Sequence, residues 1–190
     1  MLRNALYIVF TLLVALILGF GTSYYMVENG REMSAQRFGV WYGWADAGGA
    51  DTDPYSKAVS ARSGALQLGR AEGVVFTATQ DQSGAFLSGS CSYLISGSTP
   101  SASVWTLRAA PMAENAENTD VEYLTSLQIN RNAGGTFTIT VSPNAAHGNW
   151  LPTPDSGKLK FILSFYDTNA FLVSGHELAV LPTVQKVNCS

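Results

Sequence analysis

Clusters of basic residues are missing from this sequence of 190 residues, which has 11 Lys and Arg against 14 Asp and Glu. The densest basic pair, Lys158 and Lys160, would simply share one face of a strand. Because nucleic-acid phosphates are bound by clustered Lys and Arg, a nucleic-acid partner is not expected for this chain, whose formal net charge is −3.

Motifs for metal binding and nucleophilic catalysis are missing too. The two histidines, His147 and His176, stand among Asn, Gly and Ser in expected loops, and neither H-x-x-x-H nor C-x-x-C occurs. A metal site needs further ligands at workable spacing, and a nucleophilic serine is expected in a G-x-S-x-G turn, which this sequence lacks. The sequence therefore predicts no metal and no cofactor, and it leans against an enzyme.

Charged residues are scarce, at 13% against about 25% in an average soluble domain. A hydrophobic N-terminus explains part of the deficit, and Ser, Thr, Asn and Gly make up the rest. This composition suits an exported β domain better than a cytosolic helical enzyme. The length allows one domain with its own core behind an anchor.

The long hydrophobic run lies at the N-terminus, where residues 4–27 carry no charge and residues 5–20 are almost continuously apolar. Roughly 20 such residues cross the ~30 Å hydrocarbon layer, so we expect a transmembrane anchor with Tyr24 and Tyr25 at interfacial depth. A cleavable signal peptide is the alternative, because Gly19 and Gly21 are spaced like a cleavage site.

Basic residues flank this run almost evenly, with Arg3 before it and Arg31 and Arg37 after it. The positive-inside rule therefore hardly favours either orientation of the segment in the membrane. A lone N-terminal hydrophobic segment is normally an export element. We expect a single-pass protein of the bacterial inner membrane whose domain faces the periplasm.

The chain is predicted to have three parts: residues 1–27 as the anchor or signal peptide, residues 28–50 as a connector and residues 51–190 as a β-rich domain. In the connector, Trp41 and Trp44 are three residues apart, which favours packing of a short helix or interfacial stretch over a binding role.

Residues 53–64 are predicted to form a short helix. Asp53 is a good N-cap, Pro54 suits the first helical position and Gly64 can end the last turn. Arg62 in this helix and Glu72 are expected to form a partly buried ion pair that holds the helix on the first strand. A ligand-facing pair is the alternative.

The remaining sequence is typical of strands. Residues 132–135 fit a hairpin loop, and Pro182 suits an edge strand. The predicted strands cover residues 74–79, 91–95, 104–107, 125–131, 136–142, 159–165 and 180–187. Their spacing predicts a mostly β fold, a jelly-roll-like antiparallel β-sandwich with a short helix, preceded by one N-terminal transmembrane helix.

The chain has two cysteines, Cys91 and Cys189. In an exported domain they are expected to form one disulfide. Closing a loop of nearly a hundred residues could stabilise the fold by up to ~4 kcal/mol. The alternative is two unpaired thiols, one in a strand and one at a frayed end.

Short stretches in a fixed order run from about residue 43 to the C-terminus. They are DPY at residues 53–55, ARSG at 61–64, LGRAEG at 68–73, LSGSCSY at 87–93, WTL at 105–107, GNWLP at 148–152 and FYDT at 165–168. With these stretches the chain resembles the bacterial family called domain of unknown function 1214. The resemblance implies a β-rich, jelly-roll-type domain, fused behind another domain or behind a short membrane segment, and it brings no activity. The chain departs from the family at Leu94, Val104 and Ser164 or Phe165, where members often have Arg or Trp.

Residues 148–152 are the best candidate for a ligand-facing loop, since Trp150 offers a stacking face and Asn149 an amide that donates and accepts. His147 and Trp105 complete the candidate ligand-binding set. The alternative, which aromatic burial favours, is a rigid loop whose Trp150 closes the open end of the sandwich.

Three functions compete. The favoured one is a non-enzymatic envelope module that binds a ligand or a protein partner, or is structural. The second is an envelope enzyme acting on carbohydrate or another small substrate through Glu72, Asp167 or His147. The third is an accessory to a two-domain protein of the same family. The sequence leaves the oligomeric state open.

Overall fold

The computed structural model describes residues 2–29, 35–44, 48–49, 52, 54, 57–58, 61, 68, 72–112, 122–154, 157–168 and 180–189. The chain forms two compact units, one of Met1–Ala35 with Ala50–Gln67 and the other of Gln36–Gly49 with Leu68–Ser190. The second unit contains all the strands named below.

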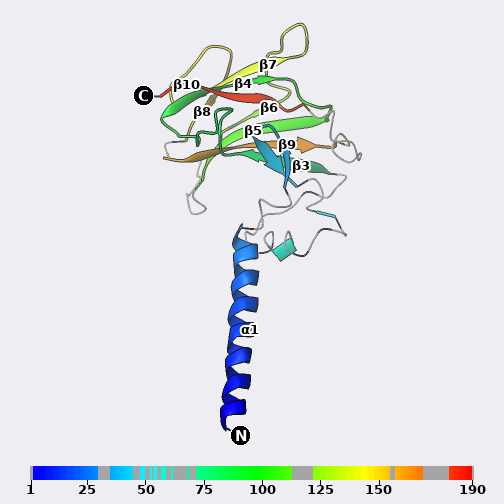
Figure 1. Ribbon diagram of the computed structural model, residues 1–190. Coiled ribbons are helices and arrows are strands. Elements are labelled where there is room, and N and C mark those ends of the chain that lie inside the picture. Colours follow the sequence, from blue (N-terminus) through cyan, green and yellow to red (C-terminus); the bar gives the residue numbers. More distant parts are fainter. Residues whose placement is uncertain are drawn as a thin grey trace. The chain divides into compact units, whose positions relative to one another are not determined.

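Helix α1 (Leu2–Asn29) belongs to the first unit (Figure 1). Its stretch Arg3–Met26 is long and apolar enough to cross a membrane, a property that signal sequences share, and none of that stretch is buried within the protein. At 1.5 Å per residue, 24 residues span about 36 Å, more than the ~30 Å hydrocarbon layer. The predicted N-terminal apolar helix is therefore present.

The larger sheet has six strands, in the order β1-β2-β3-β9-β5-β6. Every pair of neighbours is antiparallel. Its strands are β1 (Gln36–Phe38), β2 (Trp41–Gly43), β3 (Gly73–Ala78), β5 (Val104–Pro111), β6 (Tyr123–Thr125) and β9 (Leu159–Tyr166).

The smaller sheet has four strands, in the order β10-β4-β7-β8. They are β4 (Cys91–Gly97), β7 (Phe137–Ser142), β8 (Asn149–Pro152) and β10 (Thr183–Cys189). The pair β7–β8 is parallel, the one exception to the antiparallel pattern among the described strands. It runs through the stretch that the sequence predicted to be a ligand-facing loop.

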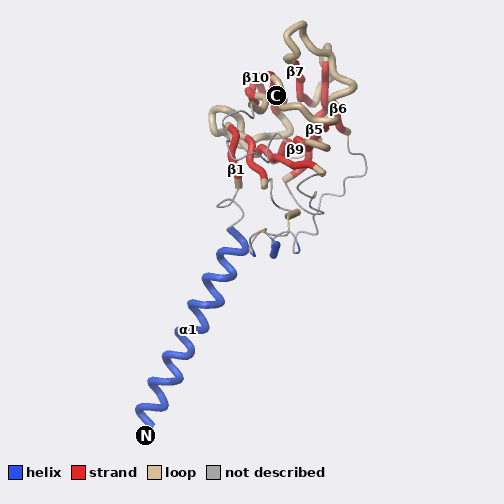
Figure 2. Tube along the Cα trace, turned by 90° about the vertical axis from the view of Figure 1, so that its right-hand side faces the viewer, coloured by secondary structure: helices blue, strands red, loops and turns tan. Residues whose placement is uncertain are grey.

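The core lies between the two sheets, because buried residues of both sheets form one hydrophobic cluster. Figure 2 shows the strands of the two sheets along the chain trace. Buried and partly exposed residues alternate along β4, β5 and β9, as expected for strands with one face inside. Four aromatic side chains, Phe76, Tyr93, Phe161 and Phe165, are fully buried at the centre. The mostly β sandwich is thus confirmed, while the jelly-roll connection of its strands stays a prediction.

Residues 36–43, expected to lie in a connector, instead form a hairpin on the six-stranded sheet. Gly39 has a φ of 61° at the first central position of the turn, as a type II′ turn requires. Trp41 packs in the core with 1% of its surface exposed, and its Nε1 donates to the Pro182 carbonyl at 2.6 Å. The tryptophan is therefore a core residue on a strand, and not part of a short helix.

Two predicted strands have different bounds. The strand predicted at 125–131 ends at Thr125, because Gln128 accepts hydrogen bonds from the Thr125 amide and hydroxyl and so closes a turn. At the C-terminus, Pro182 precedes β10, which lies at the edge of its sheet as predicted. Most of the helix predicted at 53–64 lies outside the described residues; the described ones, 54, 57, 58 and 61, are helical.

Candidate functional site

An aromatic stack joins the two sheets at the ligand-binding set predicted from the sequence. Trp105 of β5 and Phe137 of β7 lie with ring centroids 5.1 Å apart. The guanidinium of Arg131 is 5.8 Å from the Trp105 ring centroid and 5.5 Å from that of Phe137. Arg131 also donates to the Gly135 carbonyl at 3.1 Å. A cation over two rings fixes the loop before β7 on the core.

Trp105 is a core residue with 2% of its surface exposed. Its Nε1 is buried and has no hydrogen-bond partner among the described residues. A ligand could use this donor only after neighbouring side chains had moved. The position predicted for ligand contact is therefore closed in this structure.

Asn149 uses its side-chain amide inside the domain. Its Nδ2 donates to the carbonyls of Asn130 and Thr138, each at 2.9 Å, and its Oδ1 accepts from the Asn130 amide at 2.7 Å. Both amide hydrogens are thus occupied. The side chain takes the place of a neighbouring strand, because it pairs with backbone groups of Asn130, before β7, and of Thr138, in β7.

Trp150 and His147 differ in their surroundings. Trp150 is half-buried, and its Nε1 lies within hydrogen-bond distance of the Ser142 carbonyl (3.2 Å) and hydroxyl (3.1 Å). Ser142 is itself buried and donates to the Asn144 carbonyl at 2.6 Å. His147 is exposed in the connection between β7 and β8. Asn149 and Trp150 therefore lie on the same strand, β8, and both direct their polar groups to partners within the domain.

We expect replacement of Asn149 by alanine to lower the free energy of unfolding by about 1–3 kcal/mol, because it leaves the Asn130 and Thr138 groups without their partner. His147→Ala, in the exposed connection before β8, is the control and should stay within about 0.5 kcal/mol of the wild type. Denaturant unfolding followed by tryptophan fluorescence measures both. Equal stabilities of the two variants would contradict the structural role of Asn149.

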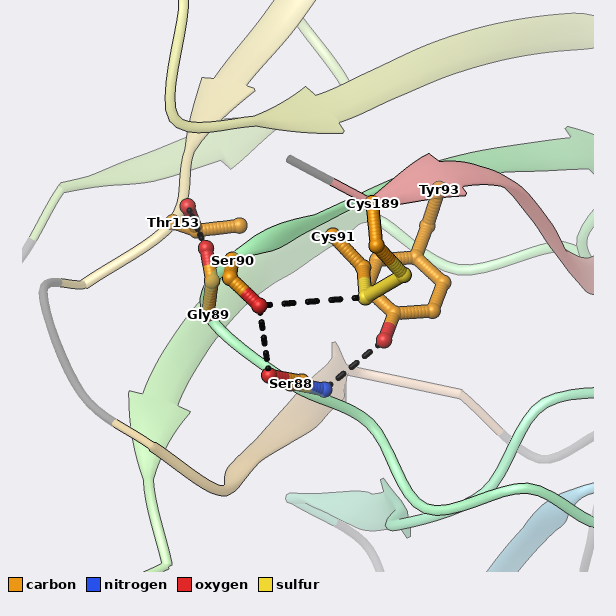
Figure 3. Close-up of a disulfide and its surroundings, with 7 residues drawn as sticks. All are labelled: Ser88, Gly89, Ser90, Cys91, Tyr93, Thr153 and Cys189. Carbon is orange, nitrogen blue, oxygen red and sulfur yellow. Dashed lines mark hydrogen bonds between the residues drawn. A yellow bond between two sulfur atoms is a disulfide. The ribbon is translucent and has the colours of Figure 1, made fainter.

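Cys91 and Cys189 form a disulfide between β4 and β10, where the two residues are direct cross-strand partners (Figure 3). It closes a loop with a sequence separation of 98 residues. Cys91 is buried, whereas Cys189 lies on the exposed end of the edge strand. The bond therefore attaches the end of the chain to the inner strand of the smaller sheet.

A buried carboxylate, Asp81, organises the loop that follows β3. Its Oδ1 accepts from the Ser83 hydroxyl (2.6 Å) and from the amides of Ser83 (2.8 Å) and Ala85 (3.1 Å). Burial alone would raise the pKa of Asp81, but these hydrogen bonds and nearby Lys186 hold its pKa below the ordinary value. The carboxylate is thus stabilised in its ionised form.

The phenol of Tyr93 lies close enough to Asp81 to respond to its charge. It is fully buried on β4, and its oxygen accepts from the Ser88 amide at 2.7 Å. Burial raises the pKa of Tyr93, and the Asp81 charge raises it further. The pair keeps the tyrosine neutral and the aspartate charged, which suits a structural loop support better than proton transfer at neutral pH.

We expect the stability of the sandwich to fall on acidification as Asp81 is protonated. Because the pKa of Asp81 is lowered on folding, its contribution is complete above the unfolded value of about 4 and is lost as pH drops through the folded value. Asp81→Asn should remove this acid-dependent part and cost about 1–3 kcal/mol at neutral pH. Unfolding curves measured between neutral and acid pH test this; parallel pH profiles of the variant and the wild type would contradict it.

The two acidic residues of the enzyme hypothesis meet at the end of the six-stranded sheet where β3 begins and β9 ends. The Asp167 amide donates to the Glu72 carbonyl at 2.9 Å, and Asp167 Oδ2 accepts from the Ser103 hydroxyl at 2.6 Å. Asp167 has a φ of 51°, a conformation that Asp tolerates better than most residues. His147 lies in the connection between β7 and β8 of the other sheet. The ion-pair partner predicted for Glu72, Arg62, lies outside the described residues.

Among the described residues, no group of three or more His, Cys, Asp or Glu could hold a metal ion. Residues 72–170 match the family described as protein of unknown function, DUF1214. This chain belongs to the DUF1214 family. The match covers β3 to β9, so it includes the aromatic stack and the loop held by Asp81. It also includes the Asp167 corner, which is the contact of Asp167 with Glu72 and Ser103.

Two solved structures resemble the DUF1214 chain. The VPA0106 protein of Vibrio parahaemolyticus has a TM-score of 0.58 at 20% identity, over 76% of this chain and 40% of that one. An uncharacterised protein of Burkholderia cenocepacia has a TM-score of 0.45 at 13% identity, over 66% and 32%. The first likeness shows the fold alone. The chain spans 40% of the length of that protein. No protein of curated function matches.

Proposed function

We propose that this DUF1214 protein is a single-pass protein of the bacterial inner membrane that holds its β sandwich in the periplasm as a binding or structural module. Helix α1 carries the proposal. Its side chains from Arg3 to Tyr25 are exposed, and the stretch Arg3–Met26 is apolar enough to span a bilayer. Such a helix is stable where lipid surrounds it, because its backbone polar groups are satisfied within the helix.

The shape of α1 at the expected cleavage site supports an anchor over a signal peptide. The helix continues through Gly19 and Gly21 to Asn29. The Thr22 hydroxyl donates to the Leu18 carbonyl at 2.7 Å, so this polar group is satisfied within the helix. The apolar stretch Arg3–Met26 also has 24 residues, more than the roughly 7–15 apolar residues of a signal peptide.

The disulfide supports the periplasmic side. Disulfides persist in oxidising compartments and are rare in the cytosol. Cys91–Cys189 joins the exposed end of β10 to β4, where a reducing cytosol would have access to it. The lone N-terminal position of the apolar helix points the same way.

The contacts of the sandwich favour a binding or structural role over catalysis. Asn149 and Trp150 direct their polar groups to backbone and side-chain partners within the domain. A protein partner in the envelope fits this arrangement, and so does the role of an accessory to a two-domain protein of the same family.

An envelope enzyme is the second candidate, and the Asp167 corner is the observation that favours it. Glu72 precedes β3 and Asp167 follows β9, and a backbone hydrogen bond joins the two residues there. Asp167 occupies a backbone conformation that is uncommon for residues other than glycine, and such conformations gather at active sites. Unchanged cellular phenotypes in the triple variant Glu72→Ala, Asp167→Ala and His147→Ala would end this candidate.

The anchor is tested by extraction of membranes at alkaline pH and by the mass of the mature chain. We expect the intact protein to stay in the membrane pellet with residues 1–21 still attached, since α1 spans the bilayer. A soluble periplasmic protein that begins at Thr22 would contradict the anchor and establish a signal peptide.

A further inference from the structure

The outward face of the six-stranded sheet carries one row of side chains across all six strands. Direct cross-strand partners share a face of the sheet. The row consists of Arg37, Tyr42, Thr77, Ile162, Arg108 and Tyr123. With strands ~4.8 Å apart, it is about 24 Å long.

Further residues on the same face enlarge this row. Lys160 and Tyr166 alternate with the buried Phe161 and Phe165 on β9, and Val75 alternates with buried residues on β3. Tyr123, Tyr166 and Val75 are 57%, 39% and 38% exposed, so the face combines cations with accessible aromatic and aliphatic groups. We call the whole set, from the row together with Lys160, Tyr166 and Val75, the arginine–tyrosine face.

The outward face of the smaller sheet has a different chemistry. Its positions between core residues are Ser92, Leu94, Ser96, Thr138, Thr140, Trp150, Thr183 and Gln185. None of these is charged. The arginine–tyrosine face, in contrast, holds Arg37, Arg108 and Lys160 and no acidic residue among its described strand positions. Among the described strand positions, the two outward faces therefore differ in charge.

The length of the chain between α1 and this face limits its distance from the bilayer. Six residues, 30–35, separate the last residue of α1 from the first residue of β1, the strand that carries Arg37. Even fully extended, six residues reach only about 20 Å. If α1 spans a membrane, the edge of the six-stranded sheet stays near the headgroups.

We propose that the arginine–tyrosine face docks on the anionic phospholipid headgroups of the bilayer that α1 crosses, an inference that rests on the proposed membrane anchor. Arginine binds phosphate oxygens in bidentate geometry, and tyrosine favours the headgroup depth of a bilayer. A basic segment held near an anionic membrane is attracted within a Debye length. The uncharged face of the smaller sheet then points away from the lipid, towards soluble partners.

The test uses the full chain in nanodiscs of phosphatidylglycerol and of phosphatidylcholine, each with a trace of lipid that carries a gadolinium chelate on its headgroup. Methyl signals of Val75 and Ile162 report the arginine–tyrosine face, and those of Leu94 report the opposite face. We expect the first two to broaden strongly in phosphatidylglycerol and weakly in phosphatidylcholine. Leu94 should stay sharp in both.

Two matched double variants distinguish binding by the cations of this face from attraction by the total charge of the sandwich. Arg108→Gln with Lys160→Gln removes one arginine and one lysine from the face, while Arg131→Gln with Lys186→Gln removes the same charges elsewhere on the sandwich. Because Arg131 contacts the Trp105 and Phe137 rings, circular dichroism first establishes that both variants are folded. The first pair should lower the ratio of docked to free sandwich by about fivefold per cation. The second pair should leave the broadening of Val75 and Ile162 unchanged.

Each outcome decides the inference. Three results would overturn docking while leaving the anchor intact. The broadening could be equal for Ile162 and Leu94, it could be the same in both lipids, or both double variants could lose it to the same degree. A chain that does not stay with the nanodiscs would overturn the anchor itself, and docking with it. Broadening confined to the face, dependent on phosphatidylglycerol and lost only in the first variant supports docking.

Discussion

Replacing Cys91 and Cys189 by alanine is expected to lower the free energy of unfolding of the sandwich by about 4 kcal/mol. The reason is the sequence separation of 98 residues, because a cross-link over so long a loop removes much of the entropy of the unfolded chain. The edge position of β10 adds to the effect, since its residues beyond Val184 are exposed and contribute little to the core. Denaturant unfolding of the full chain in detergent measures the loss.

The wild type treated with a reducing agent is the control, and it should unfold at the same denaturant concentration as the double alanine variant. A variant with Ser90→Ala, which keeps the disulfide and changes only its neighbour, should remain close to the oxidised wild type. If the reduced wild type is as stable as the oxidised one, the disulfide does not hold the C-terminal strand, and the account of β10 is wrong.

Trp41→Ala is expected to cost about 3–5 kcal/mol, a loss as large as that of the disulfide. The side chain is 1% exposed in the core, and its indole nitrogen donates to the Pro182 carbonyl before β10. Its removal leaves a cavity and an unpaired carbonyl. The measurement is the free energy of unfolding of the full chain, with near-ultraviolet circular dichroism to report the packing of the remaining aromatic residues.

Trp44→Ala is the matched control, because Trp44 follows β2 on the same segment and is only half-buried. It should cost clearly less than Trp41→Ala. Equal losses would mean that residues 36–43 do not belong to the sandwich, and that a connector up to residue 50, as the sequence alone predicts, is the better description.

Alternation of apolar and polar residues was enough to find the long strands. Residues 136–142 and 159–165 show it clearly, and they correspond to β7 and β9. The strands β1 and β2 have three residues each, too few to show a period. The sheet neighbour of β2, β3, lies about thirty residues further along the chain. Their place in the sheet depends on tertiary pairing, which a local pattern does not contain.

Some contacts of the candidate site could be predicted from the kinds of residue present, without knowledge of the fold. Two cysteines in an expected exported domain predict a bond, and the structure pairs them. The Asp81-Gln82-Ser83-Gly84 sequence could have predicted the loop held by Asp81, since Asp often bonds to the backbone two residues on. The role of Asn149 depends on Asn130 and Thr138, which only the parallel pairing of β7 and β8 brings near.

The topology of the anchored sandwich is tested most directly by labelling introduced cysteines with a membrane-impermeant maleimide. Leu127 is 78% exposed on the sandwich, and Asn4 is exposed near the start of α1. In intact spheroplasts we expect Leu127→Cys to be labelled at once, and Asn4→Cys only after the membrane is permeabilised. Labelling of Asn4→Cys alone in intact spheroplasts would place the sandwich in the cytoplasm and contradict the account.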